Sequence, residues 1–325
     1  MKRFLAIALA LLASAALIFG AALIRPAESS VEGQYKLGMG TAVSLAEGEA
    51  KSSVTTVAVI TDSNGKIVDC VIDCGDFGIS FDDVKAKKNG AYQTKNELGD
   101  SYGMVAYAGA KYEWYEQAEN FASSVKGMTA AKATMLALSG DGKAEDADIL
   151  VGCTINVQDF KKALVKAMGD TLAVTFKSDE TPALSLAMIN GDSFSDSEDA
   201  YPVEMSASIC AAASFEGKVL AAVTDVAVSQ FTYGADGTLS SAVYGGTKRE
   251  KLDSYGMVAY AGATYEWYEQ AYNFCDYIKG MTAEEIAAIP MSDVGKATDA
   301  DLIAGCTVAI GDFIKITEKA AKAAQ

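Results

Sequence analysis

The sequence predicts an α+β protein in which one structural unit occurs twice, after an apolar N-terminal segment. A segment of 30 residues beginning at Ser101 returns at Ser254 with 24 positions identical. In each copy, β-branched runs separated by turn residues come before segments with helical periodicity, which is typical of an α+β domain. A chain of 325 residues is also long enough for two domains.

The first residues have the pattern of an export signal. Lys2 and Arg3 precede the apolar run Phe4–Ile24, and Arg25 with Pro26 ends it. The 21 apolar residues would form a helix of roughly 30 Å, long enough to span a bilayer. We interpret residues 1–30 as a signal peptide or, because of this length, an uncleaved membrane anchor. The basic N-terminal flank then places the rest of the chain outside the cytoplasm, as a membrane-anchored protein of the cell surface.

The repeat sets the expected domain division. The two copies are offset by 153 residues, and the same offset carries Gly152-Cys153-Thr154 onto Gly305-Cys306-Thr307. A period of this length indicates two whole domains, because solenoid repeats are far shorter. We therefore predict one domain over residues 33–168 and a homologous domain over 169–325.

Each unit is expected to begin with an antiparallel β-meander. Residues 52–73 contain two β-branched runs on either side of Asn64-Gly65, a strong hairpin signal. Residues 207–226 repeat the pattern more loosely around Glu216-Gly217, and a further turn is predicted at Asp236-Gly237.

Helices should follow the strands in both units. Apolar and aromatic residues recur at helical spacing over Tyr112–Val125 and Tyr265–Ile278, each followed by a glycine in C-terminal cap position. Thr282 and Glu285 have capping-box spacing at the start of another helix. Residues 157–168 and 311–324 are amphipathic and predict a closing helix for each unit.

Composition excludes several function classes. The chain has no histidine, which removes Ser-His and Cys-His catalysis as well as histidine metal sites. The formal charge of -16 would repel phosphate backbones, so no nucleic-acid partner is expected. The six cysteines lack the spacing of a disulfide framework or a zinc site, and no metal site is predicted.

A short segment retained in both units is the candidate functional motif. It has an acidic residue, three apolar residues and then Gly-Cys-Thr, running from Asp148 to Thr154 and from Asp301 to Thr307. A helix predicted directly after it would direct free N–H groups toward an anion near the threonine hydroxyl, and the glycine would let a bulky group approach the backbone. Alternatively, the threonines are N-terminal caps of the closing helices.

The motif resembles the flavinylation motif of the FMN-binding domain family, in which a flavin transferase joins a threonine to the phosphate of FMN. The usual family pattern is Asp-x-x-Ser-Gly-Ala-Thr. This chain departs from it at Val151 and Ala304, which replace the serine, and at Cys153 and Cys306, which replace the alanine.

Other segments are similar to tandem-domain flavinylated surface proteins of Gram-positive bacteria, which pass electrons outward in extracellular electron transfer. These segments are Gly65-Lys66, Thr94-Lys95, Glu97-Leu98 and Glu113–Gln117. The resemblance implies two FMN groups held covalently through threonine phosphoesters, with local lysines near the phosphate. It implies these cofactor-binding residues: Thr154, Thr307, Gly152, Gly305, Cys153, Cys306, Asp148 and Asp301.

The resemblance also implies partners and a role. The partners would be a flavin transferase using FAD as FMN donor, an electron donor in the membrane and an extracellular electron acceptor. The chain would be an electron carrier more than an enzyme, because flavin supplies redox chemistry that side chains lack. Asp148 and Asp301 would be read by the transferase; alternatively, Asp301 caps a turn or helix.

Aromatic and thiol side chains leave two questions open. A flavin ring could stack on aromatic residues of the repeated segment, or these residues could belong to the core. They are Tyr102, Tyr107, Tyr112, Trp114 and Tyr115, with Tyr255, Tyr260, Tyr265, Trp267 and Tyr268 in the second unit. Cys153 and Cys306 could react with flavin or be buried thiols.

Two other functions are compatible with the residues. The first is a flavin-free cell-surface module that binds a peptide or small ligand with the same fold. The second is a reductase acting on a small acceptor, for which the sequence offers no acid-base constellation.

Overall fold

The computed structural model of the chain describes residues 33–46, 51–82, 85–88, 92–194, 200–234 and 236–324. The predicted signal or anchor segment, residues 1–30, lies outside them. In the part of the chain that is described, no helix combines the length and the apolar character needed to cross a membrane.

The strands form two antiparallel sheets, and the mixed α+β class is confirmed. Their orders are β4-β3-β2-β1-β5 and β6-β7-β8-β9. The strands are β1 (Gly33–Ala46), β2 (Lys51–Thr61), β3 (Ile67–Asp82), β4 (Lys85–Lys88), β5 (Val174–Ser178), β6 (Ala183–Phe194), β7 (Ala200–Phe215), β8 (Lys218–Gly234) and β9 (Leu239–Thr247).

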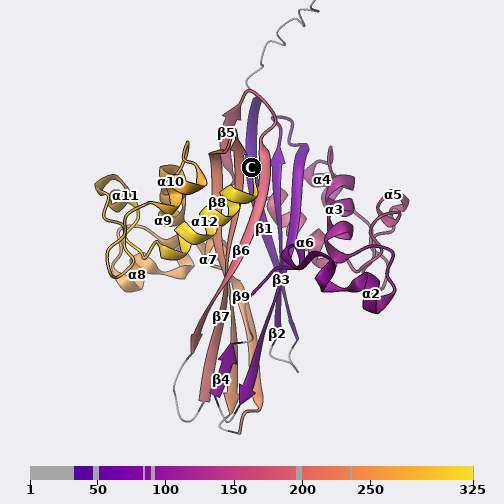
Figure 1. Cartoon of the computed structure of the whole chain (residues 1–325), viewed down its shortest axis with the longest axis horizontal. Coiled ribbons are helices and arrows are strands. Elements are labelled where there is room, and N and C mark those ends of the chain that lie inside the picture. Colours follow the sequence, from indigo (N-terminus) through magenta and orange to yellow (C-terminus); the bar gives the residue numbers. More distant parts are fainter. Residues whose placement is uncertain are drawn as a thin grey trace, which may run out of the picture. The chain divides into compact units, whose positions relative to one another are not determined.

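The helices follow the strands in each repeat and flank the two sheets (Figure 1). In the first repeat they are α1 (Lys95–Leu98), α2 (Met104–Ala108), α3 (Trp114–Ser124), α4 (Ala130–Met135), α5 (Ala147–Leu150) and α6 (Gln158–Met168). In the second they are α7 (Lys248–Lys251), α8 (Met257–Ala261), α9 (Trp267–Tyr277), α10 (Ala283–Ala287), α11 (Ala300–Gly305) and α12 (Gly311–Ala323). Short 3-10 turns follow α1 at Gly99–Tyr102 and α7 at Leu252–Tyr255.

The predicted hairpins and the capping box are confirmed. Gly65 has a positive φ of 69° in the β2-β3 turn, where Asp62 accepts hydrogen bonds from two backbone N–H groups of the turn. The β7-β8 turn has only two residues, Glu216 and Gly217, and both have positive φ, as the right-handed twist of the strands favours. Thr282 caps α10 by accepting from the N–H group of Glu285.

The central strands of each sheet are buried on both faces. Along β7, Ala207 and Ile209 face the other sheet, whereas Cys210 and Ala212 alternate with them and face the helices of the second repeat. The sheet-to-sheet core contains side chains from both repeats. Its fully buried large members include Leu37, Ile60, Met188, Ile209 and Phe231. Two packed sheets with helices on each outer face make four layers.

Because this core is shared, Glu32–Gln325 group into one compact unit. Strand β5 follows the predicted domain boundary at residues 168 and 169, yet it pairs with β1 of the first repeat, Phe176 opposite Tyr35. The two domain ranges stay a prediction. In the structure, the linking strand belongs to the first sheet.

Two ion pairs join the repeats reciprocally. Lys166 of α6 contacts Glu250 of α7 at 2.6 Å, and the equivalent Lys319 of α12 contacts Glu97 of α1. Each lysine also donates to a main-chain carbonyl of its own repeat, in β1 and in β6. The same contact made in both directions is typical of a two-fold arrangement.

A more deeply buried ion pair holds the linker, residues 169–173 between α6 and β5, against α7. The guanidinium of Arg249 donates to Asp170 at 2.7 Å and to the carbonyl of Leu172 at 2.6 Å. The side chains of Arg249 and Asp170 are only 11% and 7% exposed. Asp170 also accepts from the N–H group of Met39 in β1, so one carboxylate connects α7, the linker and the first sheet.

Leu252 has a backbone conformation that favours glycine, with φ 46° and ψ −132°; its counterpart in the first repeat is Gly99, with φ 51° and ψ −129°. We predict that Leu252→Gly raises the free energy of unfolding by about 1 kcal/mol, because strain is relieved and the leucine is 40% exposed. Urea unfolding measures the change. Gly99→Leu is the matched control and should lower stability, while equal or lower stability of Leu252→Gly contradicts the interpretation.

Candidate functional site

The two motifs lie at equivalent places on the outer sides of the helical layers. Asp148 is in the first turn of α5 and Asp301 in the first turn of α11, and both side chains are exposed. Figure 1 places α5 and α11 on opposite flanks of the central sheets. Each motif then continues through its glycine and cysteine to an exposed threonine, Thr154 or Thr307.

The alternative that these threonines cap the closing helices is wrong. The N-cap residues of α6 and α12 are Val157 and Ile310, each three residues after its threonine. The N–H groups of these two N-cap residues donate to the carbonyls of Gly142 and Gly295 and not to a preceding helical turn. The helices therefore begin after these residues. The helix therefore does not directly follow the motif, and the threonine hydroxyl is free of a capping role.

The alternative cap at Asp301 is also wrong. The N-cap of α11 is Asp299, whose carboxylate accepts from the N–H groups of Asp301 and Leu302. In the first repeat, Asp146 accepts from the N–H group of Asp148 in the same way. The motif aspartates are thus exposed first-turn residues, a position that a helix dipole favours for a carboxylate.

A buried glutamine fixes each motif threonine. Gln117 of α3 accepts from the N–H and Oγ1 of Thr154 at 2.9 and 3.3 Å. Gln270 of α9 accepts from the same atoms of Thr307 at 2.8 and 3.2 Å. Each glutamine is 1% exposed, and its Nε2 donates to a main-chain carbonyl just ahead of its own helix. The backbone at the hydroxyl is therefore held from the protein interior.

Sequence reasoning missed these glutamines. The available signal was the segment Glu-Trp-Tyr-Glu-Gln-Ala, identical in both repeats. A glutamine on the apolar face of an amphipathic helix needs buried hydrogen-bond partners, which could have identified it.

At each motif glycine, a neighbouring asparagine side chain leaves no room for a Cβ atom. A Cβ at Gly152 would lie 2.5 Å from Cγ of Asn120, and one at Gly305 would lie 2.8 Å from Nδ2 of Asn273. These asparagines donate to the carbonyls of the same glycines, at 3.2 and 2.8 Å. The bulky group that was expected near the glycine is thus an asparagine side chain.

The motif cysteines are buried thiols. Cys153 and Cys306 are each 0% exposed, and burial raises the pKa of both thiols to about 11. A protonated, inaccessible thiol is a poor nucleophile, so the structure favours the packing role over reaction with flavin. All six cysteines are buried and free.

The aromatic residues divide between the core and the surface. Trp114 and Trp267 are each 5% exposed and contact a phenylalanine of the closing helix, so they belong to the core. Tyr107 and Tyr260, in contrast, are 89% and 90% exposed. The core alternative therefore does not hold for these two tyrosines, whose rings lie at the surface.

In each repeat, one helix holds both the motif threonine and the short helix that carries the exposed tyrosine. The buried carboxylate of Glu113 accepts from the N–H groups of Met104 and Val105, which open α2, at 2.8 and 3.0 Å. Gln117 lies one turn further along α3. The second repeat has the same bonds from Glu266, at the same distances. Helix α3 or α9 therefore positions both the exposed tyrosine and the exposed threonine.

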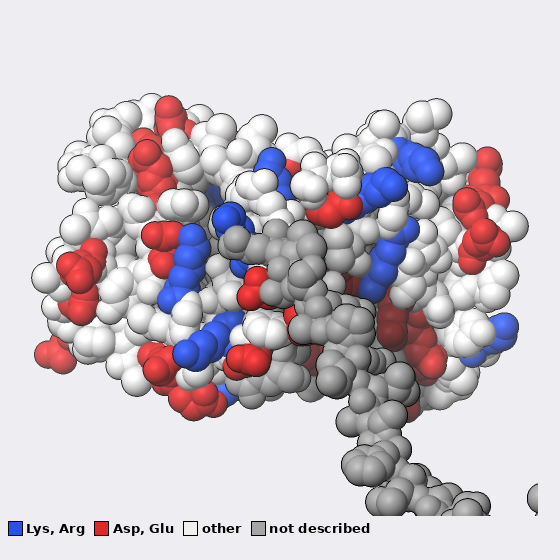
Figure 2. Space-filling view, turned by 90° about the horizontal axis from the view of Figure 1, so that it is seen from above, with Lys and Arg blue, Asp and Glu red and all other residues white. Residues whose placement is uncertain are grey.

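The surroundings of the motif are acidic. Lysines near it contact aspartates of their own segments, as Lys143 does with Asp141 at 3.3 Å and Lys162 with Asp159 at 3.0 Å. Figure 2 shows acidic side chains at both outer ends of one face and most basic side chains between them. Within the described residues, no cluster of histidine, cysteine, aspartate or glutamate could hold a metal ion.

Comparisons of the chain with protein-family models, with curated proteins and with solved structures give no match.

We predict that Gln270→Leu lowers the free energy of unfolding by about 2 kcal/mol, because the N–H groups of Thr307 and Val308 lose their shared acceptor. Chemical denaturation gives the value. Gln117→Leu should behave similarly, and Gln158→Leu at the exposed start of α6 should change little. If all three variants had the same stability as the unmodified chain, the anchoring role of the glutamines would be refuted.

Proposed function

We propose that the chain is an exported, membrane-anchored electron carrier that bears one FMN on Thr154 and one on Thr307. The observation that carries this proposal is that each repeat presents an exposed threonine whose backbone N–H and hydroxyl are both held by a buried glutamine. The 24 identities in 30 positions support an origin of the two units by duplication of one FMN-binding-type domain.

The residues fit covalent attachment better than reversible phosphate binding. Each threonine is an exposed residue, and a phosphoryl group on its hydroxyl would replace the long hydrogen bond to the glutamine and extend into solvent. The carboxylates of Asp146 and Asp148 near one motif, and of Asp299 and Asp301 near the other, would repel a free phosphate. An ester bond overcomes this repulsion, because it retains the group without a cationic pocket.

Attachment follows a simple group transfer. The threonine oxygen would bond to the FMN phosphorus of FAD, the bond to AMP would break, and the hydroxyl proton would pass to the flavin transferase. Asp148 and Asp301 are accessible to that enzyme and lie outside the buried network that holds the threonine. Bound FMN would supply one- and two-electron chemistry.

The arrangement assigns roles to this chain's own residues. Gln117 and Gln270 orient the threonines, and Tyr107 and Tyr260 offer surfaces for the flavin ring. The two sites lie on opposite flanks of the sheets (Figure 1), so each flavin would meet external partners independently. We propose a membrane electron donor and an extracellular acceptor as these partners, with residues 1–30 as the anchor.

We predict that Thr154→Ala and Thr307→Ala each remove one of two FMN equivalents when the chain is produced with the flavin transferase, and that the double variant carries none. The mass of the denatured protein measures the attachment. Thr134→Ala, an exposed threonine on α4, is the control and should keep both groups.

Two outcomes would contradict this function. Two FMN equivalents on the Thr154→Ala variant would exclude Thr154 as an attachment point. An unmodified mass of the original chain, in a host with active transferase, would favour the flavin-free surface-binding module instead.

A further inference from the structure

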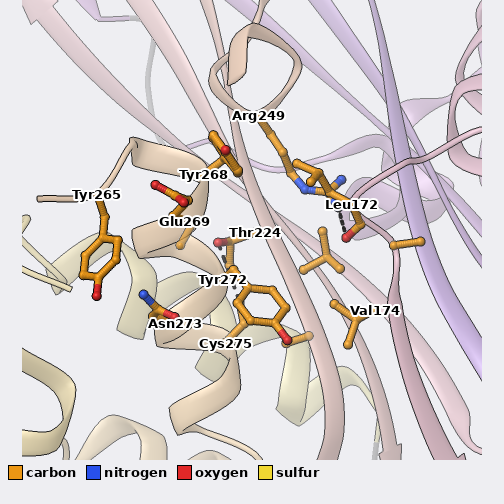
Figure 3. A pocket seen from close by; sticks show the side chains of 14 residues that line it. Leu172, Val174, Thr224, Arg249, Tyr265, Tyr268, Glu269, Tyr272, Asn273 and Cys275 are labelled. Atoms are coloured by element: carbon orange, nitrogen blue, oxygen red, sulfur yellow. Dashed lines mark hydrogen bonds between the residues drawn. The ribbon is translucent and has the colours of Figure 1, made fainter. Parts of the chain in front are cut away.

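The second repeat contains a pocket that the proposed function does not use. Its volume is about 350 Å³, within the range of small-molecule sites, roughly 300–1,000 Å³. It lies between α9, β8 and the linking strand β5 (Figure 3). With Arg249 of α7, four segments that are distant in the sequence build the pocket.

The lining is mainly aromatic and apolar. Tyr268 and Tyr272 project from adjacent turns of α9 and face Leu172 and Val174, with Thr224 of β8 between them (Figure 3). Two tyrosine rings opposite an aliphatic wall form a slot that suits a planar group, because flat rings bury much apolar area and stack favourably on other rings.

The main walls of the pocket lie away from the threonine motif, although Asn273, which donates to the carbonyl of Gly305, also belongs to the lining. Tyr268, Tyr272 and Cys275 occupy positions i, i+4 and i+7 of α9 and therefore share one face of the helix. Gln270, which holds Thr307, lies on the opposite side of the same helix. A ligand between Tyr272 and Leu172 would therefore contact a different face of α9 from the one that holds Thr307.

The charged groups that line the pocket are already engaged. Arg249 donates to Asp170 and to the carbonyl of Leu172, and Glu269 accepts from the N–H group of Glu266. A charged ligand would lose hydration without gaining a free counter-charge. The electrostatics therefore favour an uncharged ligand.

The equivalent groove of the first repeat has different chemistry. It has a similar volume, about 370 Å³, but an ion pair between Lys126 and Asp69, 2.7 Å long, lies in its lining. Glu119 occupies the position of Tyr272, and the wall provided by β5 is absent from its lining. The aromatic slot is therefore a feature of the second repeat alone.

We propose that this pocket binds a flat, uncharged aromatic molecule of about two or three fused rings. The inference does not rest on the proposed flavin function, because the pocket and its lining are complete without FMN. Its test therefore uses the full chain produced without the flavin transferase.

Titration calorimetry with 2-naphthol as probe tests the proposal. We expect saturable binding at one site, weakened about tenfold or more by Tyr272→Glu, which installs the first-repeat residue at that position. Tyr272 is 51% exposed, so this substitution should leave the fold intact, as an unfolding curve would verify. Met135→Ala, at an exposed apolar side chain of α4 outside the pocket, is the control and should keep the original affinity.

A second variant tests whether weaker binding reflects the pocket as a whole and not only the change of charge at Tyr272. Leu172→Asp changes the opposite wall and should weaken 2-naphthol binding to a similar extent. Absence of saturable binding to the original chain would overturn the proposal, as would unchanged affinity in both wall variants. Tighter binding of the anionic 2-naphthoate would overturn the assignment to an uncharged ligand.

Discussion

The two sheets pack against each other through an apolar core to which both repeats contribute. Each repeat covers one face of its sheet with its own helices, and the other face is covered by the sheet of the other repeat. A single repeat would expose that apolar face, at a cost of about 25 cal/mol for each Å². The reciprocal pairs of Lys166 and Lys319 lie at the edges of this contact, and the buried pair of Arg249 and Asp170 joins it to the linker.

The core also determines the geometry of the outer sites. Helices α3 and α9 pack on the sheets through Phe121 and Phe274, each 0% exposed. A glutamine of each of these helices holds the motif threonine. The glutamate at the N-cap of the same helix holds α2 or α8, the short helix that carries the exposed tyrosine. The candidate attachment points are therefore rigid because a core helix is rigid, although the threonines themselves are exposed.

Local patterns in the sequence predicted the hairpins, the closing helices and the capping box at Thr282, because each depends on neighbouring residues. They could not predict the shared core, since strands buried on both faces do not reveal what covers them. The true start of α6 depends on the carbonyl of Gly142, and the pocket depends on β5, about 50 residues or more from its other walls. Such contacts join segments that no local pattern relates.

The two repeats fold as one cooperative unit around the sheet-to-sheet core. Differential scanning calorimetry of the full chain tests this claim most directly, because a cooperative unit has a calorimetric enthalpy equal to its van't Hoff enthalpy. We expect a single transition with equal enthalpies. Two separable transitions, or a calorimetric enthalpy about twice the van't Hoff value, would contradict the claim and indicate two independent domains.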